Sequence, residues 1–172
     1  MKKLVVVVDM QKDFVDGALG TKAAQAIVPE TVRFLSELGP DTDVVFTRDT
    51  HFENYMDTRE GKKLPVPHCI RGTEGWEIIP ELAAFSERAV RIFDKPTFGS
   101  TELAEFVKEQ GYDEVTLFGL CTGICVLSNA VTVKAFVPEA DIRVLAGLSA
   151  CVTPESHKTA LSAMQCCQIT IV

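Results

Sequence analysis

The stretch Phe118-Gly119-Leu120-Cys121-Thr122-Gly123-Ile124-Cys125 marks the passage from an apolar strand, expected over residues 114–120, to a buried helix, expected over residues 123–136. A cysteine at the start of a helix lies near unpaired N–H groups and the positive end of the helix dipole, and both favour its thiolate. The same N–H groups can stabilise an oxyanion. Strand, tight turn, thiol and helix in this order predict that Cys125 is a nucleophile.

Further apolar runs predict the other strands. They are rich in Val, Ile, Leu and Phe and do not alternate with polar residues, which is typical of parallel strands covered by helices on both faces. We expect strands over residues 3–8, 43–47, 89–93 and 114–120, with residues 141–145 and 167–172 as two further candidates.

Helical patterns separate these strands. Residues 23–38 place apolar side chains on one stripe, with Thr31 as its only polar member and Pro29 marking a break or a new start. Residues 101–110 end at Gly111, which is typical of a C-cap, and residues 154–165 follow Thr153, a good N-cap.

The alternation of strands and helices predicts a doubly wound α/β fold, a three-layer sandwich around a mostly parallel six-stranded sheet. Right-handed crossovers then bring the carboxyl ends of the strands to one edge, where ligands bind. The length of 172 residues predicts a single domain over residues 1–172.

Composition narrows the class of protein. Hydrophobic residues make up 47 % of the chain, which is ordinary for a globular fold, and the net charge of -7 without a basic block argues against nucleic-acid binding. No apolar stretch approaches the roughly 20 residues that a membrane span needs. Met1-Lys2-Lys3 resembles the start of a signal peptide, but Asp9 interrupts the apolar run, so we expect a cytoplasmic protein.

The cysteines do not follow the regular spacing of a small disulfide-rich secreted domain, although their number, six, is even. We therefore expect reduced thiols, most of them acting as small buried hydrophobic residues. Cys166 and Cys167 are expected to point to opposite faces at the entrance of a strand.

Three reactive side chains follow predicted strands. Asp9 comes directly after four valines, where burying a carboxylate is costly unless it is paired or functional, and Lys95 and Cys125 follow two other strands. At one sheet edge, Lys95 would favour the thiolate and keep Asp9 charged, while Asp9 could take the thiol proton and return it to a leaving amine. Taken singly, residues of these types are more often an aspartate in a turn, a solvated lysine and a cysteine in the core. Their agreement at three strand ends favours a catalytic site.

The segment 48–80 is long, polar and rich in Gly and Pro, which indicates a functional or mobile region. In it, Asp49 and His51 lie on the same side of an extended stretch, and His68 adds a second imidazole. Such an O/N/N set suits Zn²⁺, Mn²⁺ or Fe²⁺. The alternative is a turn-stabilising Asp49 and a solvent-facing His51, and His157 is expected at the surface.

Motifs of several other enzyme classes are absent. The tyrosine-phosphatase pattern requires an arginine six residues after the cysteine, where this chain has Val131. The chain has no Cys-x-x-Cys, GxGxxG or P-loop, and the run from Gly147 to Cys151 lacks the closing glycine of a nucleophile elbow.

Taken in order, these segments resemble those of the isochorismatase-like cysteine hydrolases, and within them the nicotinamidases, over almost the whole chain. Three stretches carry the resemblance: Val7-Val8-Asp9-Met10-Gln11-Lys12-Asp13-Phe14, then Asp94-Lys95-Pro96 with Phe98 and Ser100, then Gly119-Leu120-Cys121-Thr122-Gly123-Ile124-Cys125-Val126. The resemblance implies an Asp9–Lys95–Cys125 triad and an oxyanion hole made by the backbone N–H groups of Cys121 and Cys125. It also implies a non-proline cis peptide at Leu120–Cys121.

The resemblance implies a metal site as well, with Asp49, His51 and His68 as ligands and Glu60 placed where a fourth could contribute. A zinc ion, or alternatively manganese or iron, would hold the pyridine nitrogen of the substrate. Thr50 and Pro65 stand where nicotinamidases commonly have aromatic residues that sandwich the substrate ring. Phe14 and Phe98 are expected to fill that role here.

The implied function is an amidohydrolase that cleaves a small carboxamide, nicotinamide above all, through a Cys125 thioester. Two alternatives stay open: a related hydrolase acting on a ureido or carbamoyl amide, and a catalytically silent binding protein that keeps the pocket. The expected partners are a small-molecule amide and further copies of the chain, since family members commonly form dimers or tetramers; nucleic acid and membrane are not expected.

Overall fold

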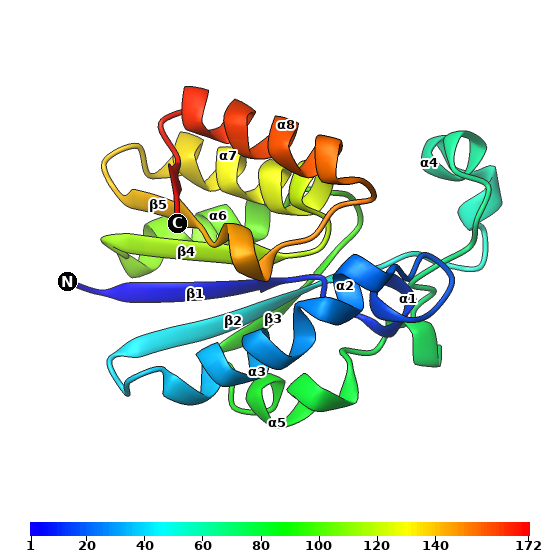
Figure 1. Cartoon of the computed structure of the whole chain (residues 1–172), viewed down its shortest axis with the longest axis horizontal. Coiled ribbons are helices and arrows are strands. Elements are labelled where there is room, and N and C mark those ends of the chain that lie inside the picture. Colours follow the sequence, from blue (N-terminus) through cyan, green and yellow to red (C-terminus); the bar gives the residue numbers. More distant parts are fainter.

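Six parallel strands form one sheet in the computed structural model, which describes residues 1–172. Their spatial order is β3-β2-β1-β4-β5-β6 (Figure 1). The order changes direction between β1 and β4, and the crevice outside the carboxyl ends of two such strands is the usual ligand position in doubly wound sheets. The strands are β1 (Lys3–Val8), β2 (Thr42–Asp49), β3 (Arg91–Lys95), β4 (Glu114–Gly119), β5 (Asp141–Val144) and β6 (Thr170–Ile171).

Helices cover both faces of this sheet, so the predicted three-layer sandwich is confirmed (Figure 1). One face carries α6 (Thr101–Gln110), α7 (Leu127–Phe136) and α8 (Pro154–Cys166). The other carries α2 (Lys22–Ala26), α3 (Val28–Glu37) and α5 (Ala83–Ser86). No helix is both long enough and apolar enough to cross a membrane.

Strand β1 lies at the centre of the sheet, and its residues after the exposed Lys3 are all apolar and buried. Leu4, Val6 and Val8 enter the core beneath α6, α7 and α8, whereas Val5 and Val7 enter the core beneath α2 and α3. Successive side chains of a strand point to opposite faces, so a strand covered on both sides has no solvent-facing position.

Shorter helical turns occupy the connections, mainly between β2 and β3. There the segment 48–80 folds into an arm that projects beyond the carboxyl ends of the strands (Figure 1). The short helical turns in all the connections are α1 (Lys12–Val15), η1 (Tyr55–Asp57), α4 (Arg59–Lys63), η2 (Glu74–Trp76), η3 (Pro80–Leu82), η4 (Thr122–Val126) and η5 (Ala146–Leu148). Of the η turns, η4 is π-helical and the others are 3₁₀ helices.

Several boundaries differ from the expected ones. Strand β3 begins at Arg91 rather than residue 89, because residues 87–90 turn out of α5, and its pairing with β2 continues to Lys95. Strand β2 continues to Asp49. The predicted break at Pro29 is confirmed, since α2 ends before it and α3 carries it in the first turn.

The expected strand over residues 167–172 is wrong over most of its length. Helix α8 continues to Cys166, Cys167 caps it, and Gln168 turns the chain with a φ of 61°, so only Thr170 and Ile171 remain in β6. Cys166 and Cys167 consequently lie exposed at the end of a helix and not at a strand entrance. All six cysteines are free thiols.

Candidate active site

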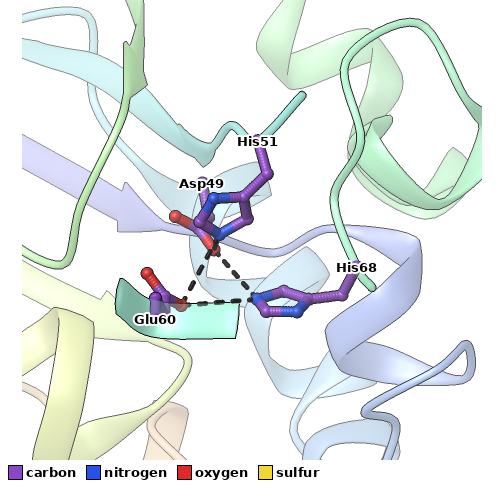
Figure 2. Close-up of side chains that lie close together, drawn as sticks. All are labelled: Asp49, His51, Glu60 and His68. Atoms are coloured by element: carbon purple, nitrogen blue, oxygen red, sulfur yellow. Dashed lines mark hydrogen bonds and ion pairs between the residues drawn. The ribbon is translucent and has the colours of Figure 1, made fainter. Parts of the chain in front are cut away.

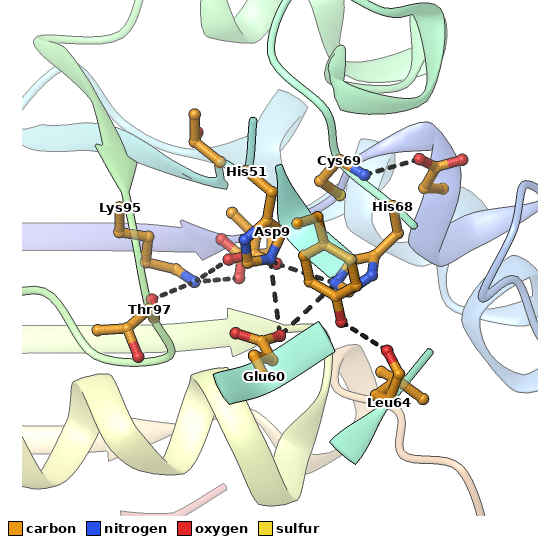
Figure 3. A network of polar contacts seen from close by, with 12 residues as sticks. Asp9, His51, Glu60, Leu64, His68, Cys69, Lys95 and Thr97 are labelled. Atoms are coloured by element: carbon orange, nitrogen blue, oxygen red, sulfur yellow. Dashed lines mark hydrogen bonds and ion pairs between the residues drawn. The ribbon is translucent and has the colours of Figure 1, made fainter. Parts of the chain in front are cut away.

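Asp9 and Lys95 form a buried ion pair at the carboxyl edge of the sheet (Figure 3). Asp9 directly follows β1, and Lys95 is the last residue of β3. The Lys95 ammonium Nζ lies 2.5 Å from Oδ2 of Asp9, and the hydroxyl of Thr47 donates to Oδ1 of Asp9 at 2.6 Å. Asp9 has a φ of 48°, a left-handed conformation that aspartate tolerates better than most residues. One carboxylate oxygen is thus contacted from β3 and the other from β2.

Cys125 lies in η4, the turn that joins β4 to α7, as the sequence predicts. The peptide bond Leu120–Cys121 is cis, which the family resemblance implied. Val8 and Gly119 are partners in the parallel register of β1 and β4, so the residues after them, Asp9 and the turn, start at the same level of the sheet. The Cys125 side chain is only 4 % exposed.

Burial and the charges of Asp9 and Lys95 all act on the pKa of the Cys125 thiol. Burial raises the pKa of Cys125 well above its ordinary value, the Asp9 carboxylate raises it further, and Lys95 opposes both. Burial also raises the pKa of Asp9, against the opposing charge of Lys95. Burial and the Asp9 carboxylate therefore favour the protonated thiol, Lys95 favours the thiolate, and Asp9 lies close enough to accept the thiol proton.

Four metal-ligand side chains gather next to this ion pair (Figure 2). Ligand atoms of Asp49, His51, Glu60 and His68 lie within 4.8 Å of one another. Oδ2 of Asp49 is 3.0 Å from Nε2 of His51 and 3.4 Å from Nε2 of His68. Oε1 of Glu60 is 3.6 Å and 3.8 Å from the same two nitrogens.

This group fits a divalent cation. Nδ1 of His68 donates to the carbonyl of Val66 at 2.8 Å, which leaves the lone pair of Nε2 facing the other ligands. Oδ1 of Asp49 is buried without a hydrogen-bond partner, and a cation would satisfy it. His51 is only 7 % exposed, so the alternative of a solvent-facing His51 is wrong.

Three local features bring the ligands together. Asp49 ends β2, and the His51 N–H donates to Cys69 O at 2.9 Å, which draws the segment with His68 alongside. Glu60 comes from the first turn of α4, which is capped by Thr58. Local spacing gives no hint that Glu60 reaches the group, because the turn η1 intervenes.

Gln11 is a residue that our sequence reasoning missed. Its side-chain amide donates to the carbonyls of Asp49 and Trp76 at 2.9 and 2.8 Å, and its oxygen accepts from the Asp49 N–H at 2.7 Å. Gln11 therefore fixes the backbone of a metal-ligand residue. Its position two residues after Asp9, directly beyond a buried strand, was the available signal, and in the structure this fully buried glutamine finds several partners.

Asn129 is a second missed residue, one helical turn after Cys125. Its amide donates to the carbonyls of Cys125 and Phe98 at 2.8 and 3.0 Å, and its oxygen accepts from the Ser100 N–H at 3.0 Å. Asn129 ties the Phe98 loop to the turn that carries Cys125.

A cavity of about 360 Å³ opens onto Cys125 and the metal-ligand group. Phe14 and Phe98 line it, as expected; Phe14 packs on His68 with ring centroids 5.5 Å apart, and Phe98 is 40 % exposed. Thr50 does not line the cavity, because its hydroxyl accepts from Nε1 of Trp76 at 2.9 Å. Leu64 supplies apolar wall that the sequence did not reveal.

His157, expected at the surface, is partly exposed on α8, and it also makes an inward contact: its Nδ1 lies 2.8 Å from the hydroxyl of Thr122 in η4.

Comparisons with known proteins agree with this geometry. The chain is 27 % identical to the nicotinamidase/pyrazinamidase of Mycobacterium tuberculosis over 184 residues, which covers 99 % of this chain and 98 % of that protein. The pyrazinamidase/nicotinamidase structure from Streptococcus mutans matches with a TM-score of 0.87 at 29 % identity and covers 99 % of both chains. The zinc complex of pyrazinamidase from Pyrococcus horikoshii matches with a TM-score of 0.83 at 28 % identity, over 100 % of this chain and 99 % of that one. The isochorismatase domain model matches residues 3–172, so the chain belongs to the isochorismatase family.

Proposed function

We propose that this protein hydrolyses nicotinamide to nicotinate and ammonia through a thioester on Cys125. One observation carries the proposal: the Lys95 ammonium lies 2.5 Å from Asp9 and 3.8 Å from Asp49, so the acid–cation pair adjoins the metal-ligand group, and Cys125 lines one cavity with three residues of that group. The names of the relatives, nicotinamidase and pyrazinamidase, support the same substrate class, an aromatic carboxamide with a ring nitrogen.

The first half-reaction transfers the acyl group to the enzyme. Asp9 takes the proton from Sγ of Cys125, and Sγ bonds to the carboxamide carbon. The N–H groups of Cys121 and Cys125 stabilise the resulting oxyanion. Asp9 then gives its proton to the amide nitrogen, the C–N bond breaks, and ammonia leaves a thioester behind.

The second half-reaction reverses the roles. Asp9 takes a proton from a water molecule that attacks the thioester carbon, the C–S bond breaks, and the proton returns to Sγ as nicotinate leaves. Lys95 keeps Asp9 in the carboxylate form that each half-reaction needs at its start. Its own pKa is lowered by burial, but the charges of Asp9, Cys125 and Asp49 outweigh burial and raise it, so Lys95 stays charged.

Asp49, His51, Glu60 and His68 would hold the divalent ion, which we propose is zinc, with manganese and iron as the alternatives. When bound, the ion supplies a Lewis acid that fixes the ring nitrogen of the substrate. Phe14 and Phe98 would flank the ring and orient the carboxamide toward Cys125.

The test measures ammonia release from nicotinamide and from benzamide, which differs only in lacking the ring nitrogen. We expect release from nicotinamide that stops on chelation and returns with zinc, much slower release from benzamide, and none from Cys125→Ala. Equal rates for the two amides would contradict a role for the ring nitrogen. No release from metal-loaded protein would reject nicotinamide, and a ureido or carbamoyl amide or a silent binding protein would take its place.

We propose further that the chain is a single domain, acts in the cytoplasm and assembles with copies of itself. Free thiols at all six cysteines suit a reducing compartment. The exposed apolar side chains of Ile124 and Val152, at the cavity rim, suit an interface between copies. Light scattering of the purified protein tests the assembly, and a monomer mass would reject it.

A further inference from the structure

The hydroxyl of Thr122 and the imidazole of His157 form a contact that the proposed reaction does not use. Oγ1 of Thr122 lies 2.8 Å from Nδ1 of His157, and it is the hydroxyl's one hydrogen-bond contact in the structure. The two residues are 35 positions apart, so the contact joins the turn η4 to the first turn of α8. Thr122 is completely buried.

Thr122 stands at a sensitive point of the nucleophile turn. It follows Cys121, whose N–H we assign to the oxyanion hole, and it begins the π-helical turn that contains Cys125. Its own N–H donates to Ala150 O at 2.9 Å, and its carbonyl accepts from the Leu127 N–H. Main chain and side chain of Thr122 are therefore fixed from three directions, and His157 supplies the third.

His157 sits on a rigid part of α8. Thr153 and Ser156 close a reciprocal capping box at the start of that helix, one residue before the histidine. The turn packs closely on α8, since a Cβ added to Gly123 would lie 3.4 Å from Cβ of Ala160. Helix α8 thus provides a well-defined packing surface for η4.

The protonation of His157 suits this contact. Burial lowers the pKa of His157, which favours the neutral ring at neutral pH. A neutral ring with its proton on Nε2 presents an acceptor at Nδ1, so the buried Thr122 hydroxyl donates to it and is satisfied.

We propose that His157 is a positioning residue: through the hydroxyl of Thr122 it holds η4 so that the Cys125 thiol and the two oxyanion N–H groups keep their relative places. The inference deepens the proposed function and rests on it for the role of those groups. It requires nothing of the metal-ligand group, which lies on other elements of the chain.

The test compares His157→Phe, which keeps a ring without Nδ1, with His157→Asn, whose amide places an acceptor near the position of Nδ1. We expect His157→Phe to lower kcat about ten-fold, the size of one lost hydrogen bond, with little change in KM. His157→Asn should recover most of the loss. Thr122→Val should lower kcat as much as His157→Phe, and Thr122→Ser should retain activity. The double variant Thr122→Val/His157→Phe should be no less active than either single variant.

A second readout does not depend on the substrate. The rate at which iodoacetamide labels Cys125, followed by mass spectrometry of its peptide, should fall in His157→Phe and recover in His157→Asn. Slower labelling without nicotinamide hydrolysis would reject the substrate and support the positioning role. Unchanged kcat and labelling in His157→Phe, equal losses in the Phe and Asn variants, or additive losses in the double variant would overturn it. If His157→Phe fails to fold, the kcat and labelling rate of Thr122→Val decide the question in its place.

Discussion

Lys95 is the register partner of Asp49 on the neighbouring parallel strand, and its Nζ lies 3.8 Å from Oδ1 of that metal-ligand carboxylate. The same ammonium makes its shorter contact, 2.5 Å, with Asp9. One buried cation therefore stands between two buried carboxylates that belong to different parts of the site. The charge of the metal-ligand group and the charge of Asp9, the proposed base, are linked through it, so a change in one should affect the other.

Lys95→Met should both inactivate and destabilise the protein. Breaking a buried ion pair by removing one partner costs about 3–5 kcal/mol, because the other charge stays buried without compensation. Urea unfolding measures the loss, with Lys108→Met on an exposed face as the control. The double variant Lys95→Met/Asp9→Asn should be more stable than Lys95→Met alone. A single variant as stable as the control would contradict the ion-pair argument.

Cys125→Ala should abolish turnover and leave the fold intact. The change removes one small side chain, so circular dichroism and the melting temperature should stay close to those of the parent protein. Cys166→Ala, at the exposed end of α8, is the matched control and should keep full activity. Residual hydrolysis by Cys125→Ala beyond a trace of contaminating enzyme would refute the thioester route.

The double variant His51→Ala/His68→Ala should lose its bound metal, since it removes both nitrogen ligands of the group. Metal content by plasma mass spectrometry is the measurement. The chain has only one further histidine, His157, so His157→Asn is a natural control and should keep its metal. An equal metal content in the parent protein, the double variant and His157→Asn would show that the ion binds elsewhere.

Stability should fall at alkaline pH because of Tyr112. Burial and the hydrogen bond from its hydroxyl to Asp43 Oδ2, 2.7 Å long, raise the pKa of Tyr112 above its ordinary value of 10.0. The unfolded chain therefore loses this proton first, and the stabilisation, complete below pH 10, declines as the pH rises toward the folded pKa. Tyr112→Phe should lose about 1 kcal/mol at pH 7 and decline less steeply above pH 10. If the free energy of unfolding declined equally with pH in the parent protein and in Tyr112→Phe, the role of Tyr112 would be contradicted.

Gly119→Ala should damage the site through the backbone. Gly119 has a φ of 128°, and an added Cβ would lie 2.1 Å from the carbonyl oxygen of Val8, the residue before Asp9. The strands β1 and β4 must separate to admit it, which moves Asp9 relative to the nucleophile turn. We expect a stability loss of at least about 1–3 kcal/mol and a large loss of kcat. Gly147→Ala, where nothing lies within 4 Å of the added Cβ, is the control and should be nearly neutral.

The sequence by itself determined the fold class and the three reactive residues. Apolar runs and the polar residues that end them are local signals, and parallel topology brings all carboxyl ends of the strands to one edge. Asp9, Lys95 and Cys125 could therefore be placed together before any contact was known. The same reasoning placed Asp49, His51 and His68 near that edge, because two of the chain's three histidines fall in one connection.

Only the tertiary structure decided the contacts and charges within the site. That β3 ends on Lys95, that Glu60 reaches the metal-ligand group, and that His157 meets Thr122 all depend on packing between segments far apart in the chain. The pKa of Cys125 is of the same kind: its position at a helix start favours the thiolate, whereas burial and the Asp9 carboxylate raise the pKa of the thiol. Burial is a property of the packed chain as a whole, and for that reason no local pattern of residues encodes it.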